Sequence, residues 1–138
     1  MAINLTHLNK LLKKSSTRVI PPGFYSAVIL EASVQESKSG NPQILYKLEV
    51  ELDTPSGLQK ALIYKFTQLA EPMFDFFLRE MELLKVVVVD MDELEEVLSG
   101  LRGTVVEIEV DYNPGYGYPV PKFLSVLCKP NWNYGYIF

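Results

Sequence analysis

Cysteine and histidine are nearly absent from this sequence of 138 residues, which has one of each, Cys128 and His7. A single cysteine excludes an internal disulfide and argues against a cysteine-based metal site. His7 is far from Cys128 in the sequence, no serine lies in a nucleophile-elbow motif, and Gly115 and Gly117 lack the third glycine of a dinucleotide-binding loop. We therefore expect a binding protein rather than an enzyme, with no catalytic residues, metal or cofactor.

Long apolar runs are also missing. No run approaches the roughly 20 residues that span a bilayer, and the first residues lack the apolar core of a signal peptide. These absences predict an intracellular, cytoplasmic protein that does not bind membranes. Its length and its hydrophobic content of 48% are typical of one globular domain. The net charge of -4 argues against a surface uniformly coated for nucleic acid.

Residues 23–52 predict a β-hairpin with long arms. Two runs rich in β-branched and aromatic residues flank a polar loop at residues 37–42, where Gly40 and Pro42 favour a turn. The first arm is apolar on both faces at its start and on one face at its end, which fits a coiled strand shared by two sheet surfaces. The second arm alternates strictly between apolar Ile44, Tyr46, Leu48, Val50 and Leu52 and charged Lys47, Glu49 and Glu51.

The rest of the chain supplies partners for this hairpin. Apolar periodicity predicts helices at residues 3–14, 71–84 and 90–101, strands at 59–67, 104–112 and 122–128, and a loop at 113–121. Pro72 takes the first position of its helix, and Asp90 is the N-cap of the next one. The helix at 71–84 carries an apolar stripe of Phe74, Phe77, Leu78, Met81 and Leu84.

This order of elements is three strands, a helical segment and two strands. It is the order of the OB-fold, a five-stranded Greek-key barrel. The predicted fold is therefore mainly β with helices (α+β), with the helical segment between strands three and four and an extra N-terminal helix. We expect residues 1–128 to form this single domain and residues 129–138 to form an aromatic C-terminal tail or arm.

Ligands of OB-folds lie across strands two and three, between the loop joining strands one and two and the loop joining strands four and five. Aromatic rings there stack on unpaired bases, at about 1–3 kcal/mol per base, and lysines meet phosphates in a salt-dependent way. The sequence therefore predicts a single-stranded nucleic acid as the ligand. The residues predicted to bind it are Lys38, Lys47, Lys60, Tyr64, Lys65, Phe66, Tyr116, Tyr118 and Lys122.

Each aromatic residue also has a structural interpretation. Tyr46 shares its parity with apolar neighbours, so it belongs in the core. Tyr64 and Phe66 fit the interior of the barrel as well as an outer face, because both parities of their strand are bulky. Tyr116 and Tyr118 lie in a loop rich in glycine and proline, which favours a contact role over a core role.

Charge is unevenly distributed along the chain. Acidic residues concentrate at 90–96 and 107–111, whereas positions 10–18 hold four basic residues and no acidic one. A locally positive groove is therefore compatible with a negative total. The acidic cluster at 90–96 suits helix capping better than metal binding, since it lacks the pattern of a calcium loop.

Several short motifs resemble a known family. They are Gly23-Phe24-Tyr25, the loop from Glu36 to Pro42, the run from Leu45 to Val50, and Leu98-Ser99-Gly100-Leu101-Arg102-Gly103 before a Val-rich strand. Together, over roughly residues 20–128, they are similar to small bacteriophage proteins regarded as OB-fold single-stranded-DNA-binding proteins. The resemblance implies a role in phage replication and recombination in the host cytoplasm, with replication or recombination proteins as further partners.

One feature departs from that family. Phage and bacterial single-strand binders often end in an acidic tail with a terminal aromatic residue that docks replication partners. This chain has Phe138 but no acidic residue after Asp111. The resulting hypothesis is a non-catalytic, homo-oligomeric single-stranded-DNA-binding protein whose N-terminal helix or C-terminal arm packs on a neighbour. The alternative is a structural or assembly protein that uses the same barrel for protein contacts.

Overall fold

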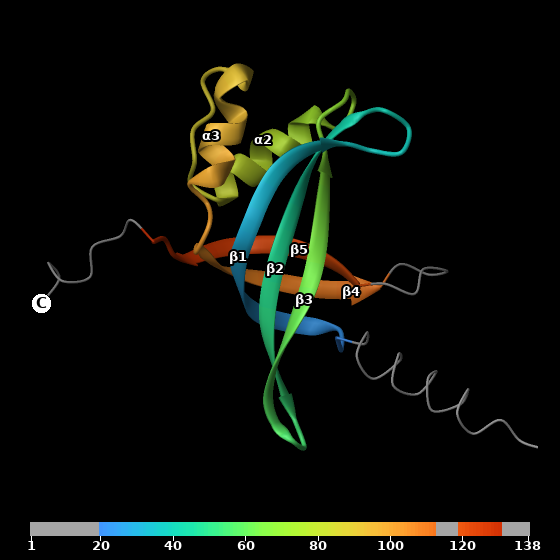
Figure 1. Cartoon of the computed structure of the whole chain (residues 1–138), viewed down its shortest axis with the longest axis vertical. Helices are drawn as coiled ribbons and strands as arrows, with labels where there is room; N and C mark the ends of the chain where they lie inside the picture. Colours follow the sequence, from blue (N-terminus) through green and yellow to red (C-terminus); the bar gives the residue numbers. More distant parts are fainter. Residues whose placement is uncertain (1–19, 113–118, 131–138) are drawn as a thin grey trace, which may run out of the picture.

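The computed structural model of the chain describes residues 20–112 and 119–130. The predicted helix at 3–14, Tyr116, Tyr118 and residues 131–138 of the predicted tail lie outside these residues. The described elements, in chain order, are β1 (Gly23–Glu36), β2 (Pro42–Thr54), β3 (Gly57–Gln68), α2 (Phe74–Leu83), the 3₁₀ turn η1 (Met91–Glu93), α3 (Leu94–Ser99), β4 (Val105–Tyr112) and β5 (Pro119–Cys128) (Figure 1).

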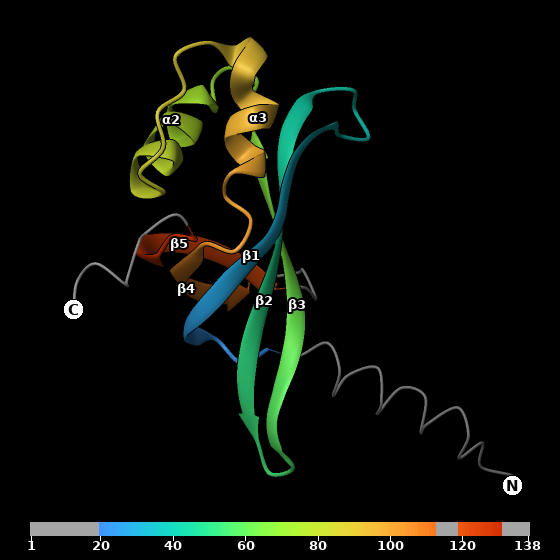
Figure 2. The same ribbon diagram turned by 60° about the vertical axis from the view of Figure 1, so that its left-hand side comes forward.

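The strands form one antiparallel sheet of five strands in the order β3-β2-β1-β4-β5. The predicted mainly β architecture, with its helical segment between the third and fourth strands, is confirmed. Strands β1, β2 and β3 run steeply side by side, and β4 and β5 cross them at a large angle (Figures 1 and 2). The two helices lie together on one side of this bent sheet, near the upper end of β1 and β2 in both views.

Strand β1 joins the two parts of the sheet. Its first half pairs with β4 and its second half with β2, and Ala27 pairs with both strands, opposite Val106 and Val50. The register shifts after Ile29, as at a β-bulge, which bends the strand. Next to the shift, the backbone of Ile29 bonds to that of Gly103 and Thr104, at 2.7 and 2.8 Å. The expectation of one strand shared by two sheet surfaces is thus confirmed.

Two predicted boundaries next to prolines were wrong. Strand β5 begins at Pro119, inside the loop predicted for residues 113–121. An edge strand tolerates prolines because one of its sides needs no ladder donors. Helix α2 begins at Phe74, so Pro72 is not its first residue. The N–H of Met73 instead donates to the carbonyl of Ala70, at 2.9 Å, in a turn before the helix.

The predicted cap at Asp90 is confirmed. Its Oδ1 accepts a hydrogen bond from the N–H of Asp92 at 2.9 Å, and the turn η1 leads directly into α3. The core lies between the inner face of the sheet and the two helices. Fully buried side chains come from every part of this core, among them Ile29, Tyr46, Leu48, Ile63, Phe77, Leu98 and Ile108.

Candidate nucleic-acid interface

The side chains of β3 divide into an outer and an inner row. Tyr64 and Phe66 lie in the outer row and keep 46% and 53% of their surface exposed, so neither fills the core. Ile63, Lys65 and Thr67 point inward, and Ile63 and Thr67 are buried. The sequence alone left both orientations open for the two rings. The structure places both rings outside, two residues apart on one strand, about 6.6 Å along the chain.

The outer row of β2 lies beside these rings. In the antiparallel register Lys47 is opposite Tyr64 and Leu45 is opposite Phe66. Directly opposite residues of an antiparallel pair share one face of the sheet. We call this surface the β2–β3 face. It consists of Leu45, Lys47, Glu49, Glu51 and Asp53 of β2 with Leu58, Lys60, Leu62, Tyr64 and Phe66 of β3.

The β2–β3 face carries two cations, Lys47 and Lys60, beside the carboxylates Glu49, Glu51 and Asp53. Lys60 is opposite Glu51 and its Nζ lies 3.6 Å from an Oε1 of Glu49, in an exposed ion pair. Lys47 has Glu31 of β1 as its other register neighbour. A shallow cavity of about 380 Å³ lies between these two side chains and Arg102. Arg102 was not among the residues predicted to bind nucleic acid, because only the fold brings it beside Lys47.

The remaining predicted residues fall at different places. Lys38 is exposed at the tip of the β1–β2 loop, and Lys122 is exposed on β5. Lys65 does not lie with its neighbours Tyr64 and Phe66, because the strand alternation turns it to the inner face. The structure therefore brings Lys47, Lys60, Tyr64 and Phe66 together on one surface and separates Lys65 from them.

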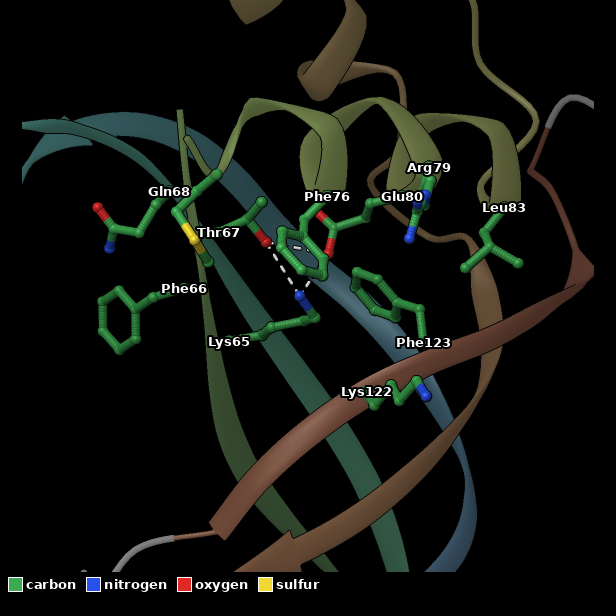
Figure 3. A pocket seen from close by; sticks show the side chains of 11 residues that line it. Lys65, Phe66, Thr67, Gln68, Phe76, Arg79, Glu80, Leu83, Lys122 and Phe123 are labelled. Carbon is green, nitrogen blue, oxygen red and sulfur yellow. Dashed lines mark hydrogen bonds and ion pairs between the residues drawn. The ribbon is translucent and has the colours of Figure 1, made fainter. Parts of the chain in front are cut away.

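A groove that the sequence did not predict lies beside Phe66. It has a volume of about 500 Å³ and is bounded by the end of β3, by α2 and by β5 (Figure 3). We call it the α2 groove. Its lining includes Phe66, Thr67, Gln68, Met73, Phe76, Arg79, Leu83, Lys122 and Phe123, with Lys65 and Glu80 at its floor.

Helix α2 also differs from its predicted stripe. Leu78, expected in the core, is 48% exposed, while Phe77, Met81 and Leu84 are buried as predicted. Phe76 lies off this stripe and is 58% exposed. A bulky aromatic residue off the apolar face of a helix was the one sequence signal that could have indicated the groove.

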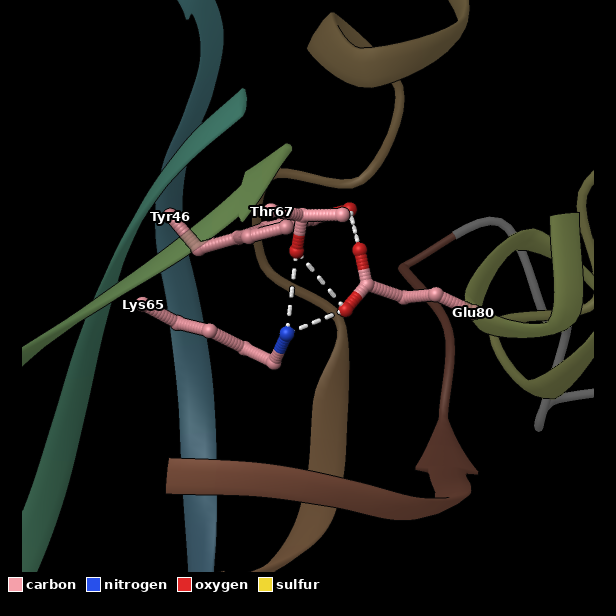
Figure 4. Close-up of polar contacts among 4 residues, drawn as sticks. All are labelled: Tyr46, Lys65, Thr67 and Glu80. Atoms are coloured by element: carbon pink, nitrogen blue, oxygen red, sulfur yellow. Dashed lines mark hydrogen bonds and ion pairs between the residues drawn. The ribbon is translucent and has the colours of Figure 1, made fainter. Parts of the chain in front are cut away.

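The floor of the groove is a closed polar network (Figure 4). Glu80 of α2 accepts a hydrogen bond from the hydroxyl of Tyr46 at its Oε2, at 2.8 Å. Its Oε1 accepts from the hydroxyl of Thr67 at 2.9 Å and forms an ion pair with Lys65. The ammonium of Lys65 donates to Thr67 as well, at 2.9 Å. Every member has a partner, so the network connects α2 to β2 and β3 without an unsatisfied group.

Aromatic rings enclose the same ammonium group. The Nζ of Lys65 is 5.1 Å from the ring centroid of Phe123 and 5.8 Å from that of Tyr46, within cation–π range. The two rings meet edge to face, with centroids 5.0 Å apart. Because Phe123 belongs to β5 and Lys65 to β3, this contact joins the two edge strands of the sheet.

Two further features were sought in the described residues, a group of metal ligands and a membrane-spanning helix. Across residues 20–112 and 119–130, no three His, Cys, Asp or Glu side chains are grouped as metal binding requires. In the same residues, no helix has the length and apolarity needed to cross a membrane. The chain matched no protein-family model, and the search of the curated proteins gave no match.

We predict that Glu80→Gln lowers the free energy of unfolding by about 3 kcal/mol, because it leaves the largely buried ammonium of Lys65 without a counter-charge. Urea unfolding followed by circular dichroism measures this. Lys60→Gln is the matched control, since it breaks the exposed Lys60–Glu49 pair and should cost about 1 kcal/mol or less. Equal effects of the two substitutions would show that the buried network does not stabilise the fold.

Burial and the nearby carboxylate of Glu80 raise the pKa of the Tyr46 hydroxyl far above its ordinary range. A tyrosine in the unfolded chain ionises at about pH 10, whereas Tyr46 in the folded protein keeps its proton at that pH. The hydrogen-bonded hydroxyl of Tyr46 therefore stabilises the fold fully below about pH 10, and this stabilisation is lost progressively as the pH rises above it. We expect the wild type to lose stability with rising alkaline pH faster than Tyr46→Phe, by up to about 1.4 kcal/mol per pH unit. Parallel stability curves of the two proteins between pH 9 and pH 11.5 would contradict this.

Proposed function

We propose that this protein is a non-catalytic single-stranded-DNA-binding protein with an OB-fold, and that unpaired bases stack on its β2–β3 face. The observation that carries the proposal is the exposure of Tyr64 and Phe66, 46% and 53%, side by side on one strand. An aromatic ring that stays exposed does not provide the hydrophobic stabilisation that it would provide if it were buried in the core. Stacking on a base, at about 1–3 kcal/mol, gives these rings a function at the surface.

The strand arrangement supports the OB-fold. Read from β4, the sheet order β4-β1-β2-β3 is the order in which the fourth strand of a Greek key returns beside the first. The contact between Lys65 and Phe123 brings the two edge strands toward each other, as in a partly open five-stranded barrel. In that fold the ligand surface is formed by strands two and three, and here strand three, β3, carries both exposed rings.

Cations near the rings support a nucleic-acid ligand. Lys47 is opposite Tyr64, Arg102 lies beside Lys47, and Lys38 extends from the adjacent loop. The interleaved carboxylates of Glu49 and Glu51 repel phosphates. We therefore propose that stacking contributes more to the affinity than charge does. The proposal includes a homo-oligomer, as expected from the N-terminal helix and the C-terminal arm. The family resemblance adds replication or recombination proteins as partners and the host cytoplasm as location.

The alternative is an assembly protein, and one observation favours it. Leu58 and Leu62, 71% and 47% exposed, lie on the same face as the two rings. Because β3 is an edge strand of the sheet, a partner chain could pair with its backbone and cover these leucines. A protein of this kind would leave oligo(dT) unbound at any salt concentration.

Titration with oligo(dT), followed by Trp132 and tyrosine fluorescence at low and high salt, tests the proposal. We expect quenching that weakens as salt rises, because phosphate contacts release counterions. Tyr64→Ala and Phe66→Ala should each lower the affinity about 5- to 150-fold, the equivalent of one lost stacking contact. Phe24→Ala is the control, because Phe24 is 67% exposed on the part of β1 that pairs with β4. A flat titration of the wild type, or an equal loss in the control, would contradict the proposal.

A further inference from the structure

The α2 groove combines apolar walls with aromatic rings at its rim. Phe76 projects toward it from α2, and Phe66 borders it at the end of β3 with its ring turned to the outer side of that strand (Figure 3). Both rings are more than half exposed. Met73 and Leu83, 41% and 40% exposed, extend the apolar wall along the helix. A volume of about 500 Å³ lies within the range of about 300–1,000 Å³ typical of small-molecule sites. The groove is therefore large enough for a nucleotide.

The groove is positive although the chain as a whole is negative. Lys65 and Glu80 neutralise each other at the floor. The other two charged side chains of the lining are both cations, Arg79 and Lys122. Neither forms an ion pair with the residues that the structure describes. Glu109 is opposite Lys122 in the register of β4 and β5 but does not line the groove.

Rings beside unpaired cations match a ligand that is both flat and anionic. The guanidinium of Arg79 lies 5.9 Å from the ring centroid of Phe76. A ring on which a base can stack and a cation that can bind a phosphate therefore lie side by side on α2. Lys122 supplies a second cation from the opposite wall, on β5. A nucleotide has both properties, a planar base and a charged phosphate.

We infer that the α2 groove is a second contact site for single-stranded DNA, in which a base stacks against Phe76 while adjacent phosphates meet Arg79 and Lys122. The inference rests on the proposed function and extends it. Phe66 belongs to both the β2–β3 face and the groove. A strand stacked on Tyr64 and Phe66 therefore continues into the groove without leaving the protein surface.

A tryptophan introduced at the rim reports directly on the groove. In a Trp132→Phe background, Phe76→Trp places the sole indole of the chain beside Arg79. We expect oligo(dT) to quench its fluorescence, since a stacked base contacts the ring. Because Phe76 is exposed, the substitution should leave the fold intact, which thermal unfolding verifies. An indole unaffected by saturating oligo(dT) would overturn the inference.

Charge variants give an independent test. Arg79→Gln and Lys122→Gln should each weaken oligo(dT) binding roughly three- to tenfold and make the slope of log affinity against log salt shallower by about 0.7, the contribution of one single-strand phosphate contact. Lys85→Gln is the matched control, because Lys85 follows α2 and does not line the groove. If both groove variants kept the wild-type affinity and the wild-type salt dependence, the inference would be overturned.

The same binding data separate a failure of the groove inference from a failure of the proposed function. If the wild type binds oligo(dT) and Tyr64→Ala weakens it while both groove variants bind normally, the proposed function stands and the groove inference is wrong. That result is also expected if the groove accommodates an apolar segment of a protein instead. If the wild type does not bind oligo(dT) at all, the proposed function fails and the groove inference fails with it.

Discussion

The ion pair between Lys65 and Glu80 is the contact on which the arrangement of both candidate surfaces depends. It attaches α2 to the inner face of β3, and Phe123 covers it from β5. A buried pair of this kind adds little net stability compared with apolar residues, but removing one partner is costly, so it fixes one arrangement. With Lys65 turned inward, strand alternation leaves Tyr64 and Phe66 outside. The same contact holds α2 at the distance from β3 that forms the groove.

The sequence predicted those features that depend on local periodicity. The alternation of β2, the turn after β1 and the cap at Asp90 all follow from neighbouring residues, and all agree with the structure. The orientation of Phe66 could not be predicted, because β3 carries bulky side chains on both parities. Nor could the pairing of Lys65 with Glu80, since it joins residues 15 positions apart through the packing of a helix on a sheet. The starts of β5 and α2 were predicted wrongly because the effect of a proline depends on its surroundings. Pro119 is tolerated in β5 because an edge strand needs no ladder donors on one side. Pro72 lies in the turn between Ala70 and Met73 that leads into α2.

The proposed binding of a polyanion by a chain of net charge -4 depends on where the charged side chains lie. On the β2–β3 face, Lys47 and Lys60 lie beside the carboxylates of Glu49, Glu51 and Asp53, so the electrostatic attraction there is weak. In the α2 groove, the only carboxylate of the lining is neutralised, and two cations are left. We therefore propose that the β2–β3 face contributes mainly base stacking and that the α2 groove contributes mainly phosphate contacts. Phe66 is the residue at which the two contributions meet.

The most direct test of the central claim is a map of amide chemical-shift changes in the ¹⁵N-labelled protein as oligo(dT) is added. We expect the largest changes along β3 near Tyr64 and Phe66, at Lys47, and on α2 near Phe76 and Arg79. Changes confined to α3 or to the part of β1 paired with β4, or no changes at saturating oligonucleotide, would contradict the central claim.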